Sequence, residues 1–223
     1  SRGVQTLQQV NANGSKNMFA NFNINKQYKT NQKFIINLYV GGYSGFNKNQ
    51  LLYNNLKSRQ TTYNFNTWSG AGINLNDKVE WNTSFSFGSN FTRYSNDVFK
   101  PIKARFTYME NELVVRLPKH FIWETQFSTD YNSNRFSANK TIVRWNAAIN
   151  YTTLKNEALV FKLSVFDILK TNVNFGSSVS RNMISTNQTN TLPQYVMLSA
   201  TYNVRPYGTG KKKVGGRDAL FQF

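Results

Sequence analysis

The amino-acid sequence alternates between apolar and polar residues over much of its length. From Met18 to Asn25 the even positions are Met, Ala, Phe and Ile, and the odd positions after Phe19 are all Asn. The same two-residue period runs through residues 34–40, 64–75 and 79–87. Successive side chains of a β-strand point to opposite faces, so this period predicts strands with one apolar and one polar face. No segment shows a comparably sustained helical period, and we expect an all-β protein.

The expected strands are long. We predict about ten of them, over residues 3–10, 17–28, 33–45, 60–75, 78–94, 102–117, 121–131, 140–152, 158–169 and 192–204. Strands in soluble proteins most often have about five or six residues, whereas a strand that crosses a bilayer needs about 9–11 at a steep tilt. Strand length therefore favours a membrane protein over a soluble sandwich.

The expected connections alternate in length. Short turns near residues 28–33, 74–78, 117–121 and 153–158 alternate with longer links at 44–60, 95–101, 132–139 and 170–191. The first hairpin, at residues 11–16, lies on the side of the long links and is itself short. Outer-membrane barrels have tight periplasmic turns and longer extracellular loops. The alternation predicts an antiparallel transmembrane β-barrel located in the bacterial cell outer membrane.

Composition excludes several other classes. Apolar runs are only three or four residues long, as at 34–36, whereas a transmembrane helix needs about 18 or more. Aromatic residues reach 15%, which argues against disorder, and the absence of Cys excludes disulfide scaffolds and thiolate metal sites. A hydrophobic share of 39% suits a barrel, because only alternate strand residues face lipid.

The two faces of each strand then have different expected environments. Asn, Ser and Thr residues are expected to face a polar lumen, where they find hydrogen-bond partners. The lipid-facing series is expected to include Leu159, Phe161, Leu163, Val165, Val196, Leu198, Ala200, Tyr202 and Val204. Aromatic residues near strand ends suit interfacial girdles, and the alternative is that they fill a sandwich core. These residues are Tyr28, Tyr63, Trp81, Tyr94, Trp123, Tyr131, Trp145 and Tyr151.

The formal net charge of +17 permits three interpretations. A basic, aromatic-rich chain can bind nucleic acid, but the cations are dispersed through turns and loops, and only residues 211–213 form a tight run. Basic loops and girdles can instead pair with the phosphates of lipopolysaccharide, and we favour this interpretation, with no nucleic-acid partner. Cations in the lumen could also steer anionic solutes.

No catalytic, cofactor-binding or metal-ligating residue is predicted, and no cofactor is expected. His120, the single His, falls in a short turn, where it is expected to be a solvated surface residue. The acid pairs Glu110/Glu112 and Asp77/Glu80 are expected to be ordinary surface charges, and no His/Asp/Glu cluster has metal-ligand spacing. Residues 208–217 superficially resemble a phosphate-binding loop. They lack its first Gly and its magnesium-binding Ser/Thr, so a flexible basic tail is expected.

The last predicted hairpin carries a resemblance. The segment Leu163-Ser164-Val165-Phe166-Asp167-Ile168-Leu169, with Asn172, leads through a long Thr/Asn-rich link to residues 191–202, TLPQYVMLSATY. This pairing resembles the final hairpin of the Bacteroidetes outer-membrane β-barrel family, whose members are relatives of TonB-dependent receptors. Residues 117–119 and 145–147 are also similar to that family, so the resemblance covers roughly the last half of the chain.

The resemblance implies a longer protein with a signal peptide, an N-terminal plug, a TonB box and a barrel of about 22 strands. The chain opens at Ser1-Arg2-Gly3, without an apolar leader, and is therefore expected to be the C-terminal portion of such a barrel. Residues 1–204 would be barrel strands and loops, and residues 205–223 a flexible basic tail. The implied partners are outer-membrane lipid, a plug domain, TonB and a surface lipoprotein.

Three functions follow as hypotheses. The first is a TonB-dependent-receptor-like transport protein whose polar lumen admits a hydrophilic solute. The second is a structural or adhesive barrel module that anchors surface loops or a partner lipoprotein. The third, an outer-membrane enzyme, requires acids and His together near the strand ends on the side of the long loops. Because His120 falls in a short turn, this hypothesis ranks last and no enzymatic activity is expected.

Overall fold

The structure is a computed structural model that describes residues 14–30, 33–53, 56–97, 99–135, 139–154, 158–171, 174–180, 183–189, 192 and 194–204. The expected strand at 3–10 and the expected tail at 205–223 lie outside the described residues. The boundary drawn after residue 204 is therefore untested.

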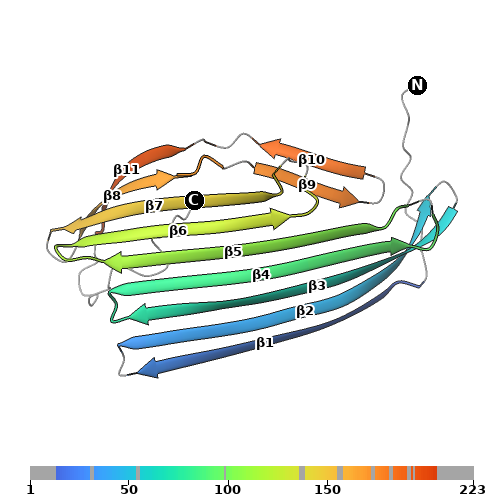
Figure 1. Cartoon of the computed structure of the whole chain (residues 1–223), viewed down its shortest axis with the longest axis horizontal. Helices are drawn as coiled ribbons and strands as arrows, with labels where there is room; N and C mark the ends of the chain where they lie inside the picture. The colour runs from blue at the N-terminus through green and yellow to red at the C-terminus, as the bar shows by residue number, and fades with distance from the viewer. Residues whose placement is uncertain are drawn as a thin grey trace.

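The described residues form eleven β-strands, nine of which build one antiparallel sheet (Figure 1). The order of strands in this sheet is β1-β2-β3-β4-β5-β6-β7-β8-β11, and β9 and β10 pair separately. The bounds are β1 Lys16–Thr30, β2 Phe34–Tyr53, β3 Leu56–Leu75, β4 Val79–Tyr94, β5 Ile102–Arg116, β6 Phe121–Asn132, β7 Thr141–Thr153, β8 Leu159–Phe166, β9 Asn174–Ser180, β10 Met183–Thr189 and β11 Tyr195–Tyr202. Among the residues that the structure describes, no helix could cross a membrane.

Nine of the expected strands are confirmed as β1 to β8 and β11, because each expected range overlaps one observed strand. Two expected links were wrong. Residues 44–60 are not a loop, because β2 and β3 continue pairing as far as Tyr53 and Leu56. Residues 170–191 contain the hairpin of β9 and β10. Both segments are rich in Asn and Ser, and neither shows a sustained apolar alternation that would mark it as strands.

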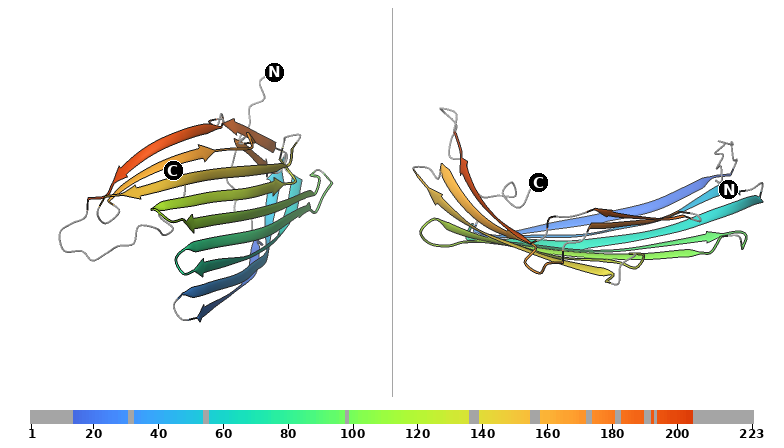
Figure 2. Two further views of the ribbon diagram at one scale, coloured as in Figure 1. Left: turned by 60° about the vertical axis from the view of Figure 1, so that its left-hand side comes forward. Right: turned by 90° about the horizontal axis from the view of Figure 1, so that it is seen from above.

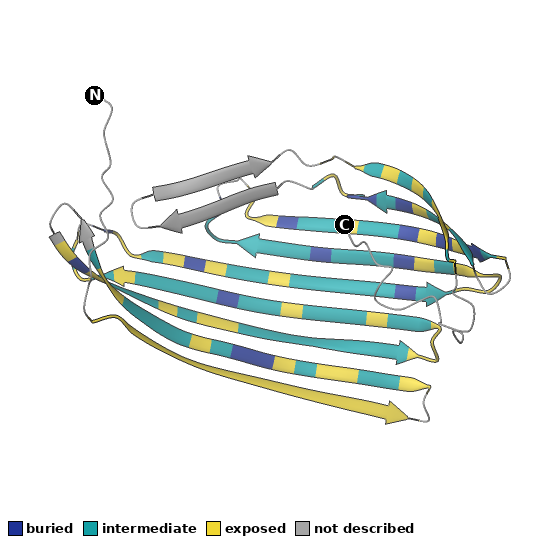
Figure 3. Ribbon diagram, turned by 180° about the vertical axis from the view of Figure 1, so that it is seen from behind, coloured by how far each residue is buried: buried dark blue, intermediate teal, exposed yellow. Residues whose placement is uncertain are grey.

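The sheet is open. Its edges are β1 and β11, which do not pair with each other, so the described strands do not close into a barrel. The sheet nevertheless curves strongly along its width (Figure 2). Edge strand β1 is exposed at every position, as Figure 3 shows by its colour. The all-β, antiparallel part of the expectation is confirmed, and barrel closure is not observed among these strands.

The connections at the two ends of the strands differ in length (Figure 1). Short turns join β1 to β2, β3 to β4, β5 to β6 and β7 to β8 at one end. The connections at the other end include the longer ones after β4, β6 and β8. We call these the short-turn end and the long-connection end. The predicted grouping of the longer links at one end is therefore confirmed for these three, although the one after β8 contains the paired strands β9 and β10. The link after β2 is instead a paired extension of two strands.

The turn between β3 and β4 illustrates how the local sequence produces the short-turn end. Asn76 and Asp77 both have positive φ angles, of 60° and 56°, and the amide of Lys78 donates to the carbonyl of Leu75 at 2.9 Å. Two-residue hairpins that match strand twist need positive φ at both central positions, and Asn and Asp tolerate it best. The Asn74 side chain also accepts a hydrogen bond from the Asp77 amide at 2.9 Å.

Candidate functional site: the polar concave face

The register of the strands sorts their side chains onto two continuous faces. The apolar face consists of the even positions of β1, β2 and β11 and the odd positions of β3 to β8, because these positions are cross-strand partners. The remaining positions form the polar face. The expected lipid-facing series of β8 and β11 shares the apolar face, where Leu163 is paired with Leu198 and Val165 with Val196.

Burial on these faces is inverted relative to a soluble protein. Most exposed large hydrophobic side chains belong to the apolar face: Met18, Phe22, Ile24, Tyr28, Phe34, Leu38, Val40, Tyr63, Phe65, Leu75, Trp81, Phe85, Phe121, Trp123, Trp145, Ile149, Tyr151, Phe161, Leu163, Val196, Leu198 and Tyr202. The buried residues of β5 to β8 all belong to the polar face: Ala104, Val114, Glu124, Ser128, Ile142, Ala148, Asn150, Thr152, Ser164 and Phe166. Side chains crowd together on the inside of a curve, so the polar face is the concave one.

Seven of the eight expected girdle aromatics lie on the apolar face, and Tyr94, the last residue of β4, lies on the other face. Tyr94 is at an even position of β4, on the polar face, with its ring 5.0 Å from that of Phe99. The indole N–H of Trp145, on the apolar face, donates to Thr125 Oγ1 at 2.8 Å. Thr125 in turn donates to the Asn146 carbonyl at 3.1 Å. Polar groups of this apolar-face pair are thus satisfied within the protein.

Glycines on the polar face let aromatic rings lie against the sheet. Tyr39 is paired with Gly70, and Gly41 with Trp68, on neighbouring strands β2 and β3. A Cβ atom at Gly70 would overlap the phenol of Tyr39, and one at Gly41 would overlap the indole of Trp68. Glycine is therefore needed at both positions because a ring occupies the space of the side chain. The result is an aromatic patch on the concave wall.

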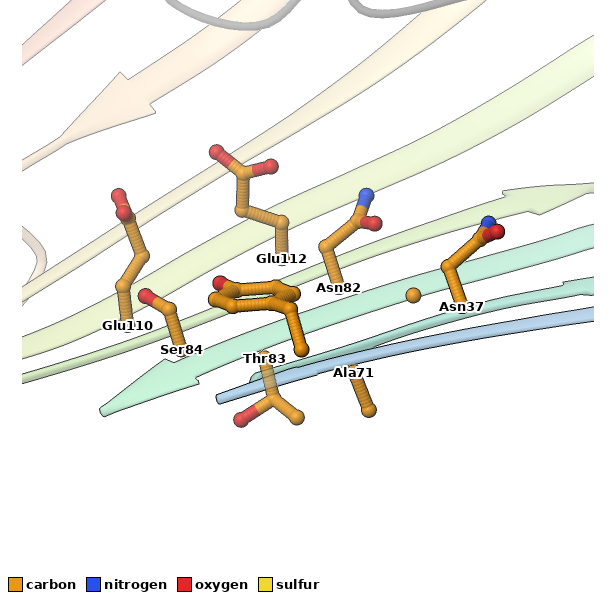
Figure 4. A pocket seen from close by; sticks show the side chains of 9 residues that line it. Asn37, Ala71, Asn82, Thr83, Ser84, Glu110 and Glu112 are labelled. Atoms are coloured by element: carbon orange, nitrogen blue, oxygen red, sulfur yellow. The ribbon is translucent and has the colours of Figure 1, made fainter. Parts of the chain in front are cut away.

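A cavity of about 350 Å³ lies beside this patch. Its lining includes Tyr39 and the polar side chains of Asn37, Asn82, Glu110 and Glu112. Figure 4 shows these Asn and Glu side chains extending from one side of the sheet, whereas Thr83 and Ala71 extend from the other. The volume is at the lower end of the range of small-molecule sites, roughly 300–1,000 Å³. Carboxylate acceptors and amide groups face the same space, so the cavity can hydrogen-bond a hydroxylated or amine-bearing solute.

Gln126 joins the two carboxylates of the cavity. Its Nε2 donates to Glu110 Oε1 at 2.7 Å and reaches Glu112 Oε1 at 3.4 Å. Asn146 Nδ2 donates to the other end of the same amide, Gln126 Oε1, at 3.3 Å. The network thus runs across β5, β6 and β7. Glu110 and Glu112 were expected to be ordinary surface charges, and the structure instead places both in this network on the concave wall.

A second polar cluster lies on the same face, across strands β6, β7 and β8. Glu124 pairs with Lys162 at 2.8 Å, and their side chains are 6% and 18% exposed. Asn150 donates to the other carboxylate oxygen of Glu124 at 2.8 Å. Ser164, on the same face, is fully buried, and its hydroxyl has no hydrogen-bond partner. These residues come from three strands, and the sequence analysis did not identify them. The signal that could have grouped them is the two-residue period, which puts all four at even positions of β6, β7 and β8.

The other residues weighed from the sequence have structural positions. His120 lies in the turn between β5 and β6 at the short-turn end, with a φ of 67°, and its carbonyl accepts from the amide of Thr152 at 3.0 Å. Asp77 lies in a hairpin turn, and Glu80 pairs with Arg116 at 2.8 Å. The glycine-rich stretch at 208–217 lies outside the described residues. The described part of the chain has no group of three or more His, Asp or Glu residues that could hold a metal ion.

Comparison with family models, with curated proteins and with solved structures gives no match for this chain.

Proposed function

We propose that this sheet is a segment of an outer-membrane β-barrel wall in a TonB-dependent-receptor-like transport protein. The apolar face would contact lipid, and the polar concave face would line a lumen through which a hydrophilic solute enters. The inverted burial of the two faces carries the proposal. The open edges β1 and β11 are consistent with a wall continued by further strands.

The size of the apolar face supports lipid as its partner. Nine strands about 4.8 Å apart, with roughly nine membrane-spanning residues each, give an apolar area on the order of 1,000 Å². Soluble monomers rarely expose contiguous apolar patches larger than a few hundred Å². Water would make such a face strongly unfavourable, at about 25 cal/mol for each Å². A bilayer removes that cost without requiring a protein partner of matching shape.

The four tryptophans provide a direct test. Trp81, Trp123 and Trp145 lie on the apolar face, and Trp68 lies on the polar face. Variants that retain one Trp each, with the others replaced by Phe, are reconstituted into bilayers that contain brominated lipid. We expect the brominated acyl chains to quench the fluorescence of the three apolar-face tryptophans strongly and that of Trp68 weakly. Aqueous acrylamide should show the opposite order.

Equal quenching of Trp68 and Trp81 by lipid would contradict the proposal. Trp81 pairs with Ile73, five residues along β3 from Trp68, so these two tryptophans differ in depth as well as in face. Acrylamide separates the two effects, because it reaches a tryptophan in the middle of a membrane-spanning strand only from a lumen. Quenching by acrylamide at all four positions, with none by lipid, would show that the apolar face meets another partner.

The transport role rests on the cavity beside Tyr39. Glu110 and Glu112 supply hydrogen-bond acceptors on the lumen side, and a plug, TonB and a surface lipoprotein would supply gating and energy elsewhere in the assembly. Uptake of small hydrophilic probes by cells that produce the protein tests this role. We expect Glu110→Gln/Glu112→Gln to change uptake while leaving membrane insertion unchanged, and unchanged uptake would favour a structural role.

The structural or adhesive alternative has one observation in its favour. At the long-connection end, β2 and β3 extend as a paired hairpin to Tyr53 and Leu56, and β9 pairs with β10. Paired hairpins present a more regular surface than irregular loops, as anchoring a partner protein requires. Shortening the β2–β3 hairpin should abolish capture of a surface lipoprotein under this alternative and leave solute uptake unchanged.

A further inference from the structure

Cations form a row on the apolar face at the long-connection end. The register aligns Lys16, Lys48, Thr61 and Arg93 across strands β1 to β4. With neighbouring strands about 4.8 Å apart, this row is roughly 14 Å wide. Lys16 and Lys48 are directly opposite each other, an arrangement of like charges that destabilises a strand pair. An anion placed against the row would remove that repulsion.

An aromatic row lies immediately inside the cationic one. Two residues nearer the middle of the strands, the register aligns Phe46, Tyr63, Phe91 and Lys103. The Arg93 guanidinium lies 5.4 Å from the ring centroid of Tyr63 and donates to its hydroxyl at 2.9 Å. Lys103 Nζ lies 5.4 Å from the Phe91 ring. The cations are therefore held where the aromatic surface ends. We call Lys16, Lys48, Arg93 and Lys103 the basic cluster.

On the described part of the apolar face, the strands offer these cations no acidic partner. The acidic residues of the described strands all belong to the polar face: Glu80, Glu110, Glu112, Glu124 and Asp130. Asp97, in the connection after β4, is the nearest described acid along the chain. Among the described strand residues, charge is thus segregated by face, and the basic cluster has no acidic neighbour on its own face.

We infer that the basic cluster binds the phosphate groups of a lipid headgroup, and that the acyl chains of this lipid lie along the aromatic row and the apolar face beyond it. Arg binds phosphate oxygens in a bidentate manner, and Lys binds them as a point charge. Apolar surface adjoins the basic cluster, so a lipid can contact both with its acyl chains and its headgroup, whereas free phosphate can contact only the cations. The width of the row matches a headgroup with more than one phosphate, as in lipid A. The inference rests on the proposed function for the orientation of the sheet in a membrane.

Native mass spectrometry of the protein extracted from outer membranes in mild detergent tests this inference. The variant Lys48→Gln/Arg93→Gln/Lys103→Gln removes three cations of the cluster, and Lys29→Gln/Lys33→Gln/Lys78→Gln removes three at the short-turn end. Arg and Lys bind phosphate through charge-assisted hydrogen bonds, so we expect the first variant to retain at least about tenfold less phosphorylated lipid A. The control variant should retain as much as the unmodified chain.

Photo-crosslinking keeps the test independent of extraction. Thr61 and Leu75 lie on the apolar face at opposite ends of β3. A photo-reactive residue at position 61 should capture phosphorylated lipid A, and one at position 75 should capture only the phospholipid of the other leaflet.

Three outcomes would overturn the inference or its premise. Equal lipid A capture at both positions would overturn the inference and leave the membrane proposal intact. Displacement of the lipid by millimolar inorganic phosphate would also overturn it, because the site would then be one for free phosphate. Failure to crosslink any lipid at either position would instead contradict the proposed function.

Discussion

At the scale of single residues, the most sensitive point of the polar face is the ion pair between Glu124, which is buried, and Lys162, which is 18% exposed. Removing one partner of a buried pair leaves an uncompensated charge and costs about 3–5 kcal/mol. We expect Glu124→Gln to lower the free energy of unfolding by an amount in that range, measured by urea titration in lipid vesicles. Glu80→Gln is the matched control, because Glu80 and Arg116 are about one-fifth exposed and such pairs contribute about 1 kcal/mol or less. Equal effects of the two substitutions would contradict the assignment of a buried pair.

Gly41 gives a second prediction at this scale. The three atoms nearest to a Cβ at Gly41 all belong to the indole of Trp68, so Gly41→Ala should displace the ring and destabilise the sheet by about 1–3 kcal/mol. The emission maximum of Trp68 should shift in the same variant. At Gly72 a Cβ atom would lie 3.0 Å from Asn82 Oδ1, the end of a flexible side chain, so Gly72→Ala should cost less. An unchanged Trp68 spectrum in Gly41→Ala would show that the ring does not lie on this glycine.

At the scale of elements, Asp167 fixes the end of β8. Its φ is 51°, its carboxylate accepts from the amide of Thr171 at 2.9 Å, and its own amide donates to Asn146 Oδ1 at 2.9 Å. Asp167→Ala loses the charged acceptor and disfavours the positive φ, so we expect a cost of about 1.5–3 kcal/mol. Protease cleavage between β8 and β11 should accelerate. Asp167→Asn retains an acceptor and tolerates positive φ, so it should behave nearly as the unmodified chain, and equal protease sensitivity of both variants would contradict this role.

The period-two pattern made the elements largely predictable, because one apolar side chain in two marks both a strand and its face. It failed at residues 46–60, where β2 and β3 continue with Asn, Lys, Gln, Ser and Arg among scattered apolar residues. Backbone pairing extends there by propagation of an existing register, which does not require apolar residues. The site was less predictable for a different reason. Glu124 and Lys162 lie 38 residues apart, and only the pairing order of β6, β7 and β8 brings them together.

At the scale of the whole molecule, the two faces predict opposite responses to the same substitution on neighbouring residues. Phe85 and Ser86 are adjacent in the middle of β4, and Phe85 is on the apolar face with 43% of its surface exposed. On a soluble protein, Arg at an exposed position such as Phe85 would change stability by less than about 0.5 kcal/mol. In a bilayer the same substitution costs about 2–4 kcal/mol near the midplane, whereas lumen positions tolerate charge.

We therefore expect Phe85→Arg to destabilise the protein in lipid vesicles by about 2–4 kcal/mol, and Ser86→Arg to have a smaller effect. Reversible urea unfolding followed by Trp fluorescence measures both. Which variant loses more stability shows whether lipid or water covers the apolar face. If water covered that face, Phe85→Arg would cost little, and Ser86→Arg would be the more destabilising substitution because side chains are crowded on the concave face. A larger loss of stability for Ser86→Arg would thus contradict a lipid-facing surface while leaving the nine-stranded sheet itself unchallenged.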